Sequence, residues 1–481
     1  MLSGINLVSI YSVITLLVHS IGVVTAAHAV MKVRSSRGAI AWGISLITFP
    51  WLAIPLYLIL GRNSFFEYAQ ALQVAYIEHY QLISQAYSTI LQFKAVLPKQ
   101  FATLVKLSEV LTPLPWTTGN EVELFIEGEK AYQTMLETIK TAKDYILLQS
   151  YIINNDYIGN KFKQALIDKA KEGVSIRLLY DKIGSRQLPR HYLKSLTKHG
   201  IKVSGFGTTK RRKGSRFKIN FRNHRKILIV DGKVGFMGGL NIGDEYLGKD
   251  PRFGYWRDTH LQIKGAAVQC LQSVFLGDWY WVTKEIPPVS WQVAKSRQKN
   301  QTVLIFPTGP ADKLENCNLF YLSLIERAQT RLWIASPYFV PNYSILNALK
   351  LAALRGVDVR IILPNRPDHL TVYLCSFSYY TELQAVNIKL YRYQSGFMHQ
   401  KVILVDDAIA GVGTVNLDNR SFFLNFEVMS FLLEQQFIER IATMLKADFN
   451  NSCLVDLKSY QAKPLWFKLA ARIARLLAPI L

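Results

Sequence analysis

Residues 223–231, Asn-His-Arg-Lys-Ile-Leu-Ile-Val-Asp, return in closely similar form as residues 398–406, Met-His-Gln-Lys-Val-Ile-Leu-Val-Asp. Both stretches contain the pattern His-x-Lys-x4-Asp, formed by His224, Lys226 and Asp231 and by His399, Lys401 and Asp406. A Gly and an Asn follow each His at the same offsets, as Gly238 and Asn241 and as Gly413 and Asn416. The apolar run in each copy predicts a buried strand that presents His and Lys from one face. Both copies are therefore expected to hold a cationic site.

The duplication extends upstream of both stretches. Residues 145–152 and 173–179 read as strands separated by an amphipathic stretch, and residues 332–339 and 356–362 repeat the arrangement. Strand, helix and strand in succession predict a parallel sheet covered by helices, with right-handed crossovers. We expect an α/β protein with two similar domains of mixed, largely parallel sheet, and one active site at the seam between them.

The N-terminal region is strongly apolar. Residues 5–29 and residues 39–60 contain no charged side chain, so each segment has the length and composition of a membrane-spanning helix of about 20 residues. A cleaved signal peptide and a buried soluble hairpin are the alternatives, although the first residues lack a basic region. The expected division is a two-helix membrane anchor, a helical linker and two domains, at residues 1–62, 63–110, 111–300 and 301–481.

The charges around the apolar segments leave the orientation in the membrane open. Lys32, Arg34 and Arg37 lie between the segments without an acidic residue, which favours a cytoplasmic loop. Arg62 and the strongly basic domain beyond it weaken this assignment, and a shallow hairpin that does not cross the membrane would give the opposite answer. The four cysteines are scattered through the chain without metal-binding spacing, and we expect neither a metal nor a cofactor.

A formal charge of +23 implies an anionic partner. Residues 182–230 contain 15 Lys and Arg and no Asp or Glu, and nine of these bases fall at positions 210–226. A solvated face and a nucleic-acid patch are alternatives, but beside two apolar segments we favour contact with anionic lipid headgroups, without a nucleic-acid partner. Lys210, Arg211, Arg212 and Lys213 form the densest part of this span.

The C-terminus has the pattern of an amphipathic helix. Leu465, Leu469, Ile473, Leu476 and Ile480 follow helical spacing, and Lys468, Arg472 and Arg475 flank them. This pattern is typical of a helix that lies in the membrane interface, although packing against a protein core would use the same spacing.

The duplicated residues suit phosphodiester chemistry. A neutral imidazole is a nucleophile toward phosphorus, and a protonated imidazole is a general acid for the leaving alkoxide. Two Lys and two Asn side chains then stabilise the charge that develops on the non-bridging oxygens. A single His near a Lys is more often structural, but the duplicated set favours catalysis.

Three longer stretches carry a family resemblance: residues 223–246, residues 255–260 (Tyr-Trp-Arg-Asp-Thr-His) and residues 413–427 (Gly-Thr-Val-Asn-Leu-Asp-Asn-Arg-Ser-Phe-Phe-Leu-Asn-Phe-Glu). With the doubled His-x-Lys-x4-Asp they resemble the phospholipase D superfamily and, within it, the bacterial cardiolipin synthases. The apolar N-terminal pair, with Arg37, Trp42, Pro50 and Gly61-Arg62, is also similar to the membrane region of that family. The resemblance covers nearly the whole chain and is looser over residues 65–106.

The resemblance implies a two-step exchange in a multi-pass protein of the bacterial inner membrane. One phosphatidylglycerol gives its phosphatidyl group to a His and releases glycerol, and a second phosphatidylglycerol then attacks to form cardiolipin. It implies His224 as nucleophile and His399 as general acid and later base, or the reverse, because the halves are nearly symmetric. Lys226, Lys401, Asn241 and Asn416 form the implied phosphate cradle.

An imidazole needs a partner that fixes its tautomer, commonly a carboxylate. In the superfamily this acid follows the signature, which implies Glu427 as partner of His399 and Asp258 as partner of His224. Asp231 and Asp406, at strand ends, are then expected to bond backbone or a Lys of the other half, or to cap a turn.

Other functions share these residues. A hydrolytic phospholipase D would let water attack, and a phosphatidylserine synthase or a nuclease of the superfamily would carry the same signatures. A nuclease has little use for two apolar helices. A non-catalytic lipid-binding scaffold has no reason to keep both His, both Lys and both Asn.

Overall fold

The computed structural model describes residues 7–33, 35–61, 65–207, 220–293 and 300–481. The chain divides into two compact units, one formed by residues 1–65 with 208–221 and one by residues 66–207 with 222–481. The basic cluster at positions 210–213 lies outside the described residues, so its contact with lipid stays a prediction.

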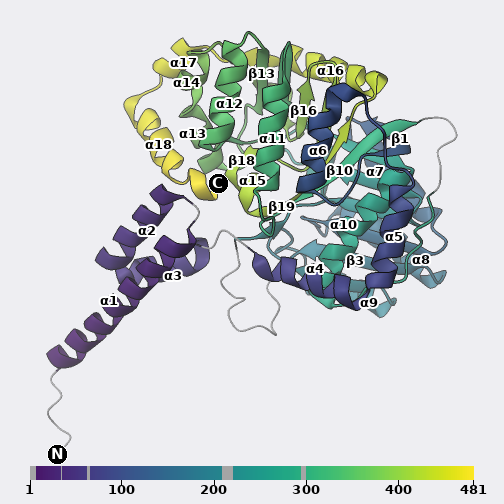
Figure 1. Ribbon diagram of the computed structural model, residues 1–481, viewed down its shortest axis with the longest axis horizontal. Helices are drawn as coiled ribbons and strands as arrows, with labels where there is room; N and C mark the ends of the chain where they lie inside the picture. Colours follow the sequence, from purple (N-terminus) through teal and green to yellow (C-terminus); the bar gives the residue numbers. More distant parts are fainter. Residues whose placement is uncertain (1–6, 34, 62–64, 208–219, 294–299) are drawn as a thin grey trace, which may run out of the picture. The chain divides into compact units, whose positions relative to one another are not determined.

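The N-terminal unit contains three helices, α1 (Leu7–Lys32), α2 (Ser36–Thr48) and α3 (Pro50–Leu60) (Figure 1). They pack around Ala29, Leu46 and Tyr57, and the Tyr57 hydroxyl lies 2.8 Å from Nδ1 of His28. Within α1, Ile10–Lys32 has a mean hydropathy of 1.9 and is the one helix of the described residues that is long and apolar enough to cross a membrane.

The second apolar segment is not the single helix that we expected. Phe49 has non-helical backbone angles, and Pro50 starts α3 directly after it. Proline lacks the N–H of the helical ladder and disfavours helical geometry at the preceding residue, so the segment divides into helices of 13 and 11 residues. The two-helix, multi-pass anchor stays a prediction.

The larger unit is built on one continuous sheet whose two halves repeat each other (Figure 1). The first half has the order β4-β3-β2-β6-β7-β9-β1, with β1 (Thr117–Phe125), β2 (Tyr145–Ser150), β3 (Ser175–Asp181), β4 (Lys202–Phe206), β6 (Ile227–Val230), β7 (Val234–Gly238) and β9 (His260–Lys264). The second half has the order β14-β13-β11-β16-β17-β19-β10, with β10 (Gln301–Thr308), β11 (Arg331–Ala335), β13 (Asp358–Pro364), β14 (Lys389–Tyr393), β16 (Val402–Val405), β17 (Ile409–Gly413) and β19 (Asn425–Leu432). β20 (Ser452–Leu454) extends the second half beside β14. The halves join where β1 pairs antiparallel with β10.

The mixed sheet agrees with expectation, but the expected predominance of parallel pairing is wrong. Parallel pairing within the two repeated orders is confined to β2-β3-β4 and β11-β13-β14. The strands that carry the signatures form antiparallel hairpins, β6 with β7 and β16 with β17. Asp231 and Asp406 lie in the hairpin turns with φ of 51° each, and turns this short can join only antiparallel neighbours.

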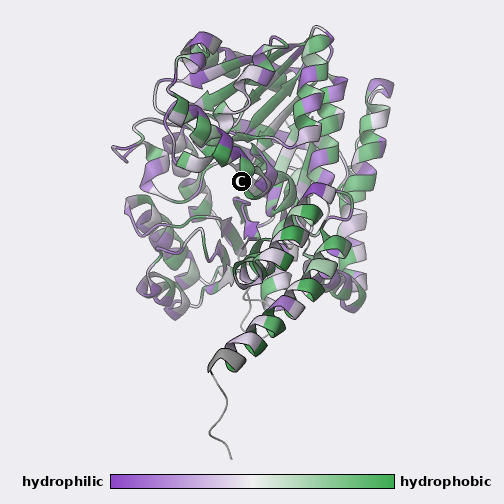
Figure 2. Cartoon of the chain, turned by 90° about the vertical axis from the view of Figure 1, so that its left-hand side faces the viewer, coloured by the Kyte–Doolittle hydropathy of each residue, from purple (hydrophilic) through white to green (hydrophobic). Residues whose placement is uncertain are grey.

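Helices cover both faces of the sheet, and hydrophobic residues line the strands and the helix faces that pack on them (Figure 2). On one face, Ile146 and Leu148 of β2 share a core with α7 (Gly128–Lys140) and α8 (Tyr157–Lys171). The equivalent core of the second half lies under α11 (Asn316–Arg327) and α12 (Tyr343–Leu354). On the other face lie α10 (Ala266–Thr283) and its counterpart α16 (Gln435–Asn450), whose Phe449 packs on Trp333 at 5.2 Å.

The remaining helices lie before, within and after the repeated halves. Their bounds are α4 (Phe66–Glu78), α5 (Tyr80–Leu91), α6 (Ala102–Leu111), α9 (Arg190–Lys198), α13 (Leu370–Phe377), α14 (Tyr380–Gln384), α15 (Asn419–Phe423), α17 (Leu457–Gln461) and α18 (Leu465–Leu476). α4, α5 and α6 lie in the segment expected as a helical linker, and the division of the chain at residues 63–110 stays a prediction.

A buried ion pair joins α10 to the first signature. Arg225 donates two hydrogen bonds of 2.9 Å from Nη1 to the carboxylate of Asp278, which also accepts from Tyr68 of α4 at 2.7 Å. Arg257 makes a matching bidentate pair with Asp448 of α16, at 2.8 and 2.9 Å. Both pairs are almost fully buried.

Replacing Asp278 with Ala is expected to lower the free energy of unfolding by about 3–5 kcal/mol, because it leaves the Arg225 guanidinium buried without a counter-charge. Chemical denaturation of the purified protein in detergent measures this loss. Asp168→Ala removes the exposed partner of Lys171 and should cost at most about 1 kcal/mol. Equal costs for the two variants would contradict the structural role of the buried pair.

Candidate active site

The first signature histidine is buried against a carboxylate of the second half. Nδ1 of His224 lies 2.9 Å from Oε2 and 3.1 Å from Oε1 of Glu427. Glu427 also accepts hydrogen bonds from Ser421 Oγ at 3.0 Å and Asn425 Nδ2 at 3.1 Å. An ionised carboxylate only accepts, so Nδ1 of His224 carries the proton and Nε2 keeps its lone pair.

The second signature histidine has the matching arrangement. Nδ1 of His399 lies 2.8 Å from Oδ2 of Asp258, whose other oxygen accepts from the backbone N–H of Thr259 at 2.8 Å. Trp256 packs against the His399 ring at a centroid distance of 5.2 Å. Both imidazoles therefore present Nε2 as the reactive nitrogen.

The pairing of acids with histidines is the reverse of what we expected. Glu427 serves His224 and not His399, and Asp258 serves His399 and not His224. The backbone gives the reason, because β5 (Arg222–Asn223) pairs with the start of β19, and His224 N donates to Phe426 O at 2.9 Å.

The backbone places His399 beside Asp258 in the same way. β15 (Phe397–Met398) pairs with β8 (Trp256–Arg257), and His399 N donates to Arg257 O at 2.8 Å. Each histidine N–H thus bonds the residue just before the carboxylate of the opposite half. The parallel register, continued by one residue, sets the histidine beside that carboxylate. Within the described residues, neither signature histidine bonds a carboxylate of its own half.

The signature lysines are buried beside the histidines. Lys226 Nζ donates to the backbone oxygen of His224 at 2.7 Å, and Lys401 makes the equivalent bond to His399. Lys401 Nζ also lies 2.9 Å from Nδ1 of His399. That nitrogen has one proton, which we assign to the bond with Asp258, because a carboxylate is the better acceptor and an ammonium cannot donate to a protonated nitrogen.

Burial lowers the pKa of all four basic side chains of the two signatures. It holds the pKa of Lys226 well below its ordinary value and lowers the pKa of Lys401 to about 8. Burial also lowers the pKa of His224, against the attraction of Glu427. Burial and Lys401 together lower the pKa of His399 to about 4. Both imidazoles are therefore neutral at pH 7 before an anion enters the site.

The two orienting carboxylates are held in the ionised form. Burial by itself raises the pKa of Asp258, but Lys401 and His399 lower it further than burial raises it. Burial also raises the pKa of Glu427, but His224 and Lys226 lower it by more, so this pKa too falls below the ordinary value. Lys401 also lowers the pKa of His224, and Glu427 raises that of Lys401, so the charges of the two halves act on one site.

The two asparagines lie in the same region with different partners. Asn241 is engaged by the protein, because Oδ1 accepts from Ile152 N at 3.1 Å and Nδ2 donates to the Tyr246 hydroxyl at 2.5 Å. Asn416 is buried, and within the described residues its Oδ1 has no hydrogen-bond partner. The cradle role assigned to both side chains stays a prediction.

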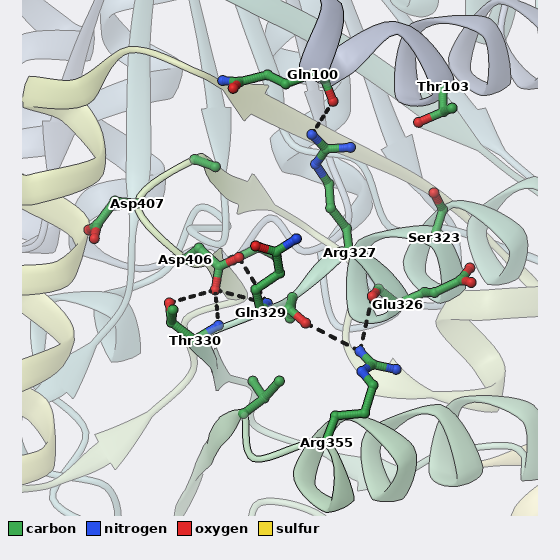
Figure 3. A pocket seen from close by; sticks show the side chains of 14 residues that line it. Gln100, Thr103, Ser323, Glu326, Arg327, Gln329, Thr330, Arg355, Asp406 and Asp407 are labelled. Atoms are coloured by element: carbon green, nitrogen blue, oxygen red, sulfur yellow. Dashed lines mark hydrogen bonds between the residues drawn. The ribbon is translucent and has the colours of Figure 1, made fainter.

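The signature aspartates lie away from the histidines. Asp231 accepts from the backbone N–H groups of Lys143, Asp144 and Tyr145, at 2.9 Å each. Asp406 accepts from the backbone of residues 329–331 (Figure 3). At about 3.3 Å per residue, each Asp lies roughly 15 Å along its strand from the signature Lys. The expectation of backbone bonding is confirmed.

A pocket of about 1170 Å³ opens beside Asp406, between α6 and the end of α11 (Figure 3). Arg327, Arg355 and Glu326 line it, whereas neither signature histidine does. Arg355 donates to carbonyl oxygens at the end of α11, which ties it to the fold. This pocket is therefore separate from the candidate active site.

The repeated glycines allow neighbouring strands to approach closely. A Cβ on Gly238 would lie 2.6 Å from the backbone of His260, and a Cβ on Gly413 would lie 2.3 Å from the carbonyl oxygen of Val428. Any side chain at either position would therefore push β9 or β19, and with it Asp258 or Glu427, out of place.

Several site residues were missed in the sequence. Tyr151 packs edge-on against the His224 ring at 5.0 Å, and Ser421 bridges Glu427 to the backbone N–H of Asn416. The signal for Tyr151 is present, because a Tyr follows the first repeated strand in both halves, as Tyr151 and Tyr338. Ser421 has no such signal.

Metal ligation finds no support in the geometry. In the parts of the chain that the structure describes, no group of three or more His, Cys, Asp or Glu side chains could hold an ion. Lys226 and Lys401 are the basic side chains that the signatures bring to the site. The absence of a cofactor stays a prediction.

A duplicated mixed sheet that brings two buried His and Lys pairs together defines a phospholipase D-like enzyme. The family model for the cardiolipin synthase, PLD-like domain matches residues 135–279 and 321–450. Cardiolipin synthase A of Pseudomonas fluorescens is 41% identical over 481 residues, with 98% of each chain covered. Cardiolipin synthase A of Pseudomonas putida is 41% identical over 471 residues, with 97% of each chain covered.

The chain belongs to the cardiolipin synthase family of phospholipase D-like proteins. It is accordingly a phosphatidyltransferase. The fold is also similar to that of the phosphatidylserine synthase of Haemophilus influenzae, with a TM-score of 0.59 and 16% identity over 78% of this chain and 99% of that one.

Proposed function

We propose that the protein forms cardiolipin from two molecules of phosphatidylglycerol through a phosphatidyl-histidine intermediate. The observation that carries the proposal is the crossed pairing, in which each histidine bonds a carboxylate of the other half through Nδ1. This pairing leaves both Nε2 atoms available for one phosphodiester, one as nucleophile and one for proton transfer.

In the first step, Nε2 of His224 attacks the phosphorus of phosphatidylglycerol. The bond from phosphorus to the headgroup glycerol oxygen breaks, and protonated His399 gives its proton to that oxygen. Glycerol leaves, and the phosphatidyl group stays on His224. The entering anion opposes the effect of Lys401 and raises the pKa of His399 toward the range that an acid needs. The choice of His224 as nucleophile rests on the family resemblance.

In the second step, His399 is neutral and acts as base. It takes the proton of the terminal hydroxyl of a second phosphatidylglycerol, whose oxygen attacks the same phosphorus. The bond from phosphorus to Nε2 breaks, which restores His224 and releases cardiolipin. Both steps conserve charge and protons without a further reactant.

The buried lysines supply the charge that the phosphoryl group needs. Lys226 and Lys401 are costly to bury as cations, and an anion between them removes part of that cost. As negative charge grows on the non-bridging oxygens, two fixed cations stabilise the transition state more than the ground state. Asn241 and Asn416 complete the proposed cradle.

Lipid analysis after incubation with phosphatidylglycerol alone tests the function. The proposal predicts cardiolipin and glycerol in equal amounts. Phosphatidic acid with glycerol would instead show that water is the acceptor and that the protein is a hydrolase. Protein with His224→Ala gives the background for both products.

Activity is expected to persist in excess chelator, because Lys226, Lys401 and an imidazolium meet the charge that a divalent ion meets in metal-dependent enzymes. The measurement is the rate of cardiolipin formation before and after treatment with a chelator and dialysis. Complete loss of activity, restored by one added metal, would contradict this.

Membrane attachment is part of the proposal. The apolar α1, with α2 and α3 behind it, supports an N-terminal anchor in the bacterial inner membrane, where phosphatidylglycerol and cardiolipin are found as substrate and product. Glycosylation or cysteine-accessibility mapping on both sides of the membrane would determine whether the chain crosses once or twice, and which side carries the active site.

A further inference from the structure

The C-terminal helix α18 is apolar on two faces. One face packs on the rest of the second unit: Ala471 and Ala474 are buried, and Phe467 packs against Phe377 of α13 at 5.1 Å. Arg475, on the same face, donates a 2.7 Å hydrogen bond to Glu382 of α14. The packing of this face explains why α18 lies along α13 (Figure 1).

The other face of α18, the outer face, carries Leu465, Trp466, Leu469, Ile473 and Leu476. These side chains are 81%, 68%, 58%, 54% and 77% exposed. Ile480, which we expected in the same stripe, lies beyond the helix and is only half-exposed. Soluble surfaces rarely expose so many large apolar side chains together, and such a patch marks an interaction surface.

The charges around the outer face identify its partner. Lys463, Lys468 and Arg472 flank the apolar stripe, and no acidic residue follows Asp456 in the sequence. An apolar stripe with a basic border is complementary to a bilayer surface, where the apolar side chains enter the acyl boundary and the bases contact anionic headgroups. The ring of Trp466 is amphipathic, which favours a position at the level of the lipid headgroups.

The chain that follows α18 is attached next to the active site. Leu481 O accepts from Arg420 N at 2.9 Å, and Ala478 O accepts from Asn419 Nδ2 at 2.8 Å. Arg420 and Asn419 belong to α15, the short helix whose Ser421 contacts both Asn416 and Glu427. The outer face therefore lies at the active-site end of the sheet.

We propose that the outer face of α18 docks on an anionic lipid surface and holds the active-site end of the sheet beside that surface. A phosphatidylglycerol headgroup would then reach His224 and His399 without leaving the bilayer. Docking does not depend on the reaction catalysed, whereas its effect on turnover rests on the proposed function.

The test places an environment-sensitive fluorophore on the outer face of the full chain. Cys453 is the exposed cysteine of the four, so Cys453→Ser removes it, and Leu469→Cys then provides the labelling position. The protein is reconstituted in phosphatidylcholine vesicles with and without phosphatidylglycerol. We expect nitroxide-labelled lipid to quench the fluorophore at position 469, and more strongly when phosphatidylglycerol is present.

The matched control is Leu354→Cys in the same background. Leu354 is also an exposed leucine near a helix end, 68% exposed, but it lies close to Asp358, which pairs with Arg331 at the far end of the sheet. Its fluorophore should not be quenched. Quenching at both positions, or at neither, would overturn the proposal; the second result would mean that water, the α1–α3 helices or a second copy of the chain covers the outer face.

A second variant, Leu469→Ser with Ile473→Ser, measures the consequence for catalysis. Both side chains are exposed, so the fold should tolerate the change. Cardiolipin formation is expected to fall on vesicles and to stay at the parent level on detergent-dispersed phosphatidylglycerol. Equal vesicle rates for variant and parent would overturn the orienting role. A parent that quenches at position 469 but makes no cardiolipin would refute the proposed function alone.

Discussion

Cardiolipin formation is expected to fall to background in the His224→Ala variant and by roughly 10²–10⁴-fold in the His399→Ala variant. The first change removes the atom that bonds phosphorus, and the second removes a proton donor whose contribution is typically of that size. The rate of cardiolipin release from isotopically labelled phosphatidylglycerol in detergent measures both effects.

The control for these variants is His191→Ala. His191 is an exposed residue of α9, away from the carboxylates and lysines of the site, and its loss should leave the rate unchanged. If either signature variant kept a substantial part of the parent rate while remaining folded, the two-histidine account would be wrong.

Glu427→Gln and Asp258→Asn are each expected to reduce turnover by roughly 10²–10⁴-fold, because an amide can donate to Nδ1 and force the proton of the imidazole onto Nε2. The crossed pairing predicts different defects. Glu427→Gln should impair the nucleophile His224, and Asp258→Asn should impair the acid and base His399.

Single-turnover experiments separate the two defects. With Asp258→Asn, the phosphatidyl group should still reach His224 slowly and then persist, because deprotonation of the acceptor is impaired. With Glu427→Gln, little adduct should form. The opposite assignment of defects would show that each acid serves the histidine of its own half. Asp406→Asn is the matched control, since its backbone bonds lie at the far end of β16 and its loss should lower stability rather than the rate per folded molecule.

The duplicated architecture could be predicted because each half repeats its strands, its signature and its trailing Gly and Asn. The pairing of strands within each half was misjudged, although a signal was present. Asp231-Gly232 after an apolar strand is typical of a hairpin turn, which implies antiparallel pairing of β6 and β7. Pro50 was a similar signal for the break between α2 and α3.

The crossed carboxylates could not be predicted in the same way. Both halves offer a histidine and a downstream acid, so the sequence fits pairing within a half and pairing between halves equally well. The choice between the two pairings is determined by the contact of β5 with β19 and of β8 with β15. The strands of each of these pairs are far apart in the chain. Strands of two residues carry too little pattern to reveal their partners.

One of the two buried ion pairs could be predicted in part from the sequence. Asp278 is the single charged residue of the largely buried helix α10, and an acid in such a place needs a cationic partner. The partner, Arg225, follows His224 in the signature and is one of the many bases of residues 182–230. Arg225 differs from the solvated bases in being buried, and its burial could not be predicted because it depends on the fold.

The most direct test of the central claim is to identify the covalent intermediate. Protein with His399→Ala is mixed with phosphatidylglycerol, quenched, digested and analysed by mass spectrometry. The account predicts a phosphatidyl group on the peptide that contains His224, released glycerol in equal amount, and no adduct when His224→Ala is added. An adduct on another residue, or glycerol release without any adduct, would contradict a phosphatidyl-histidine at a site shared by the two halves.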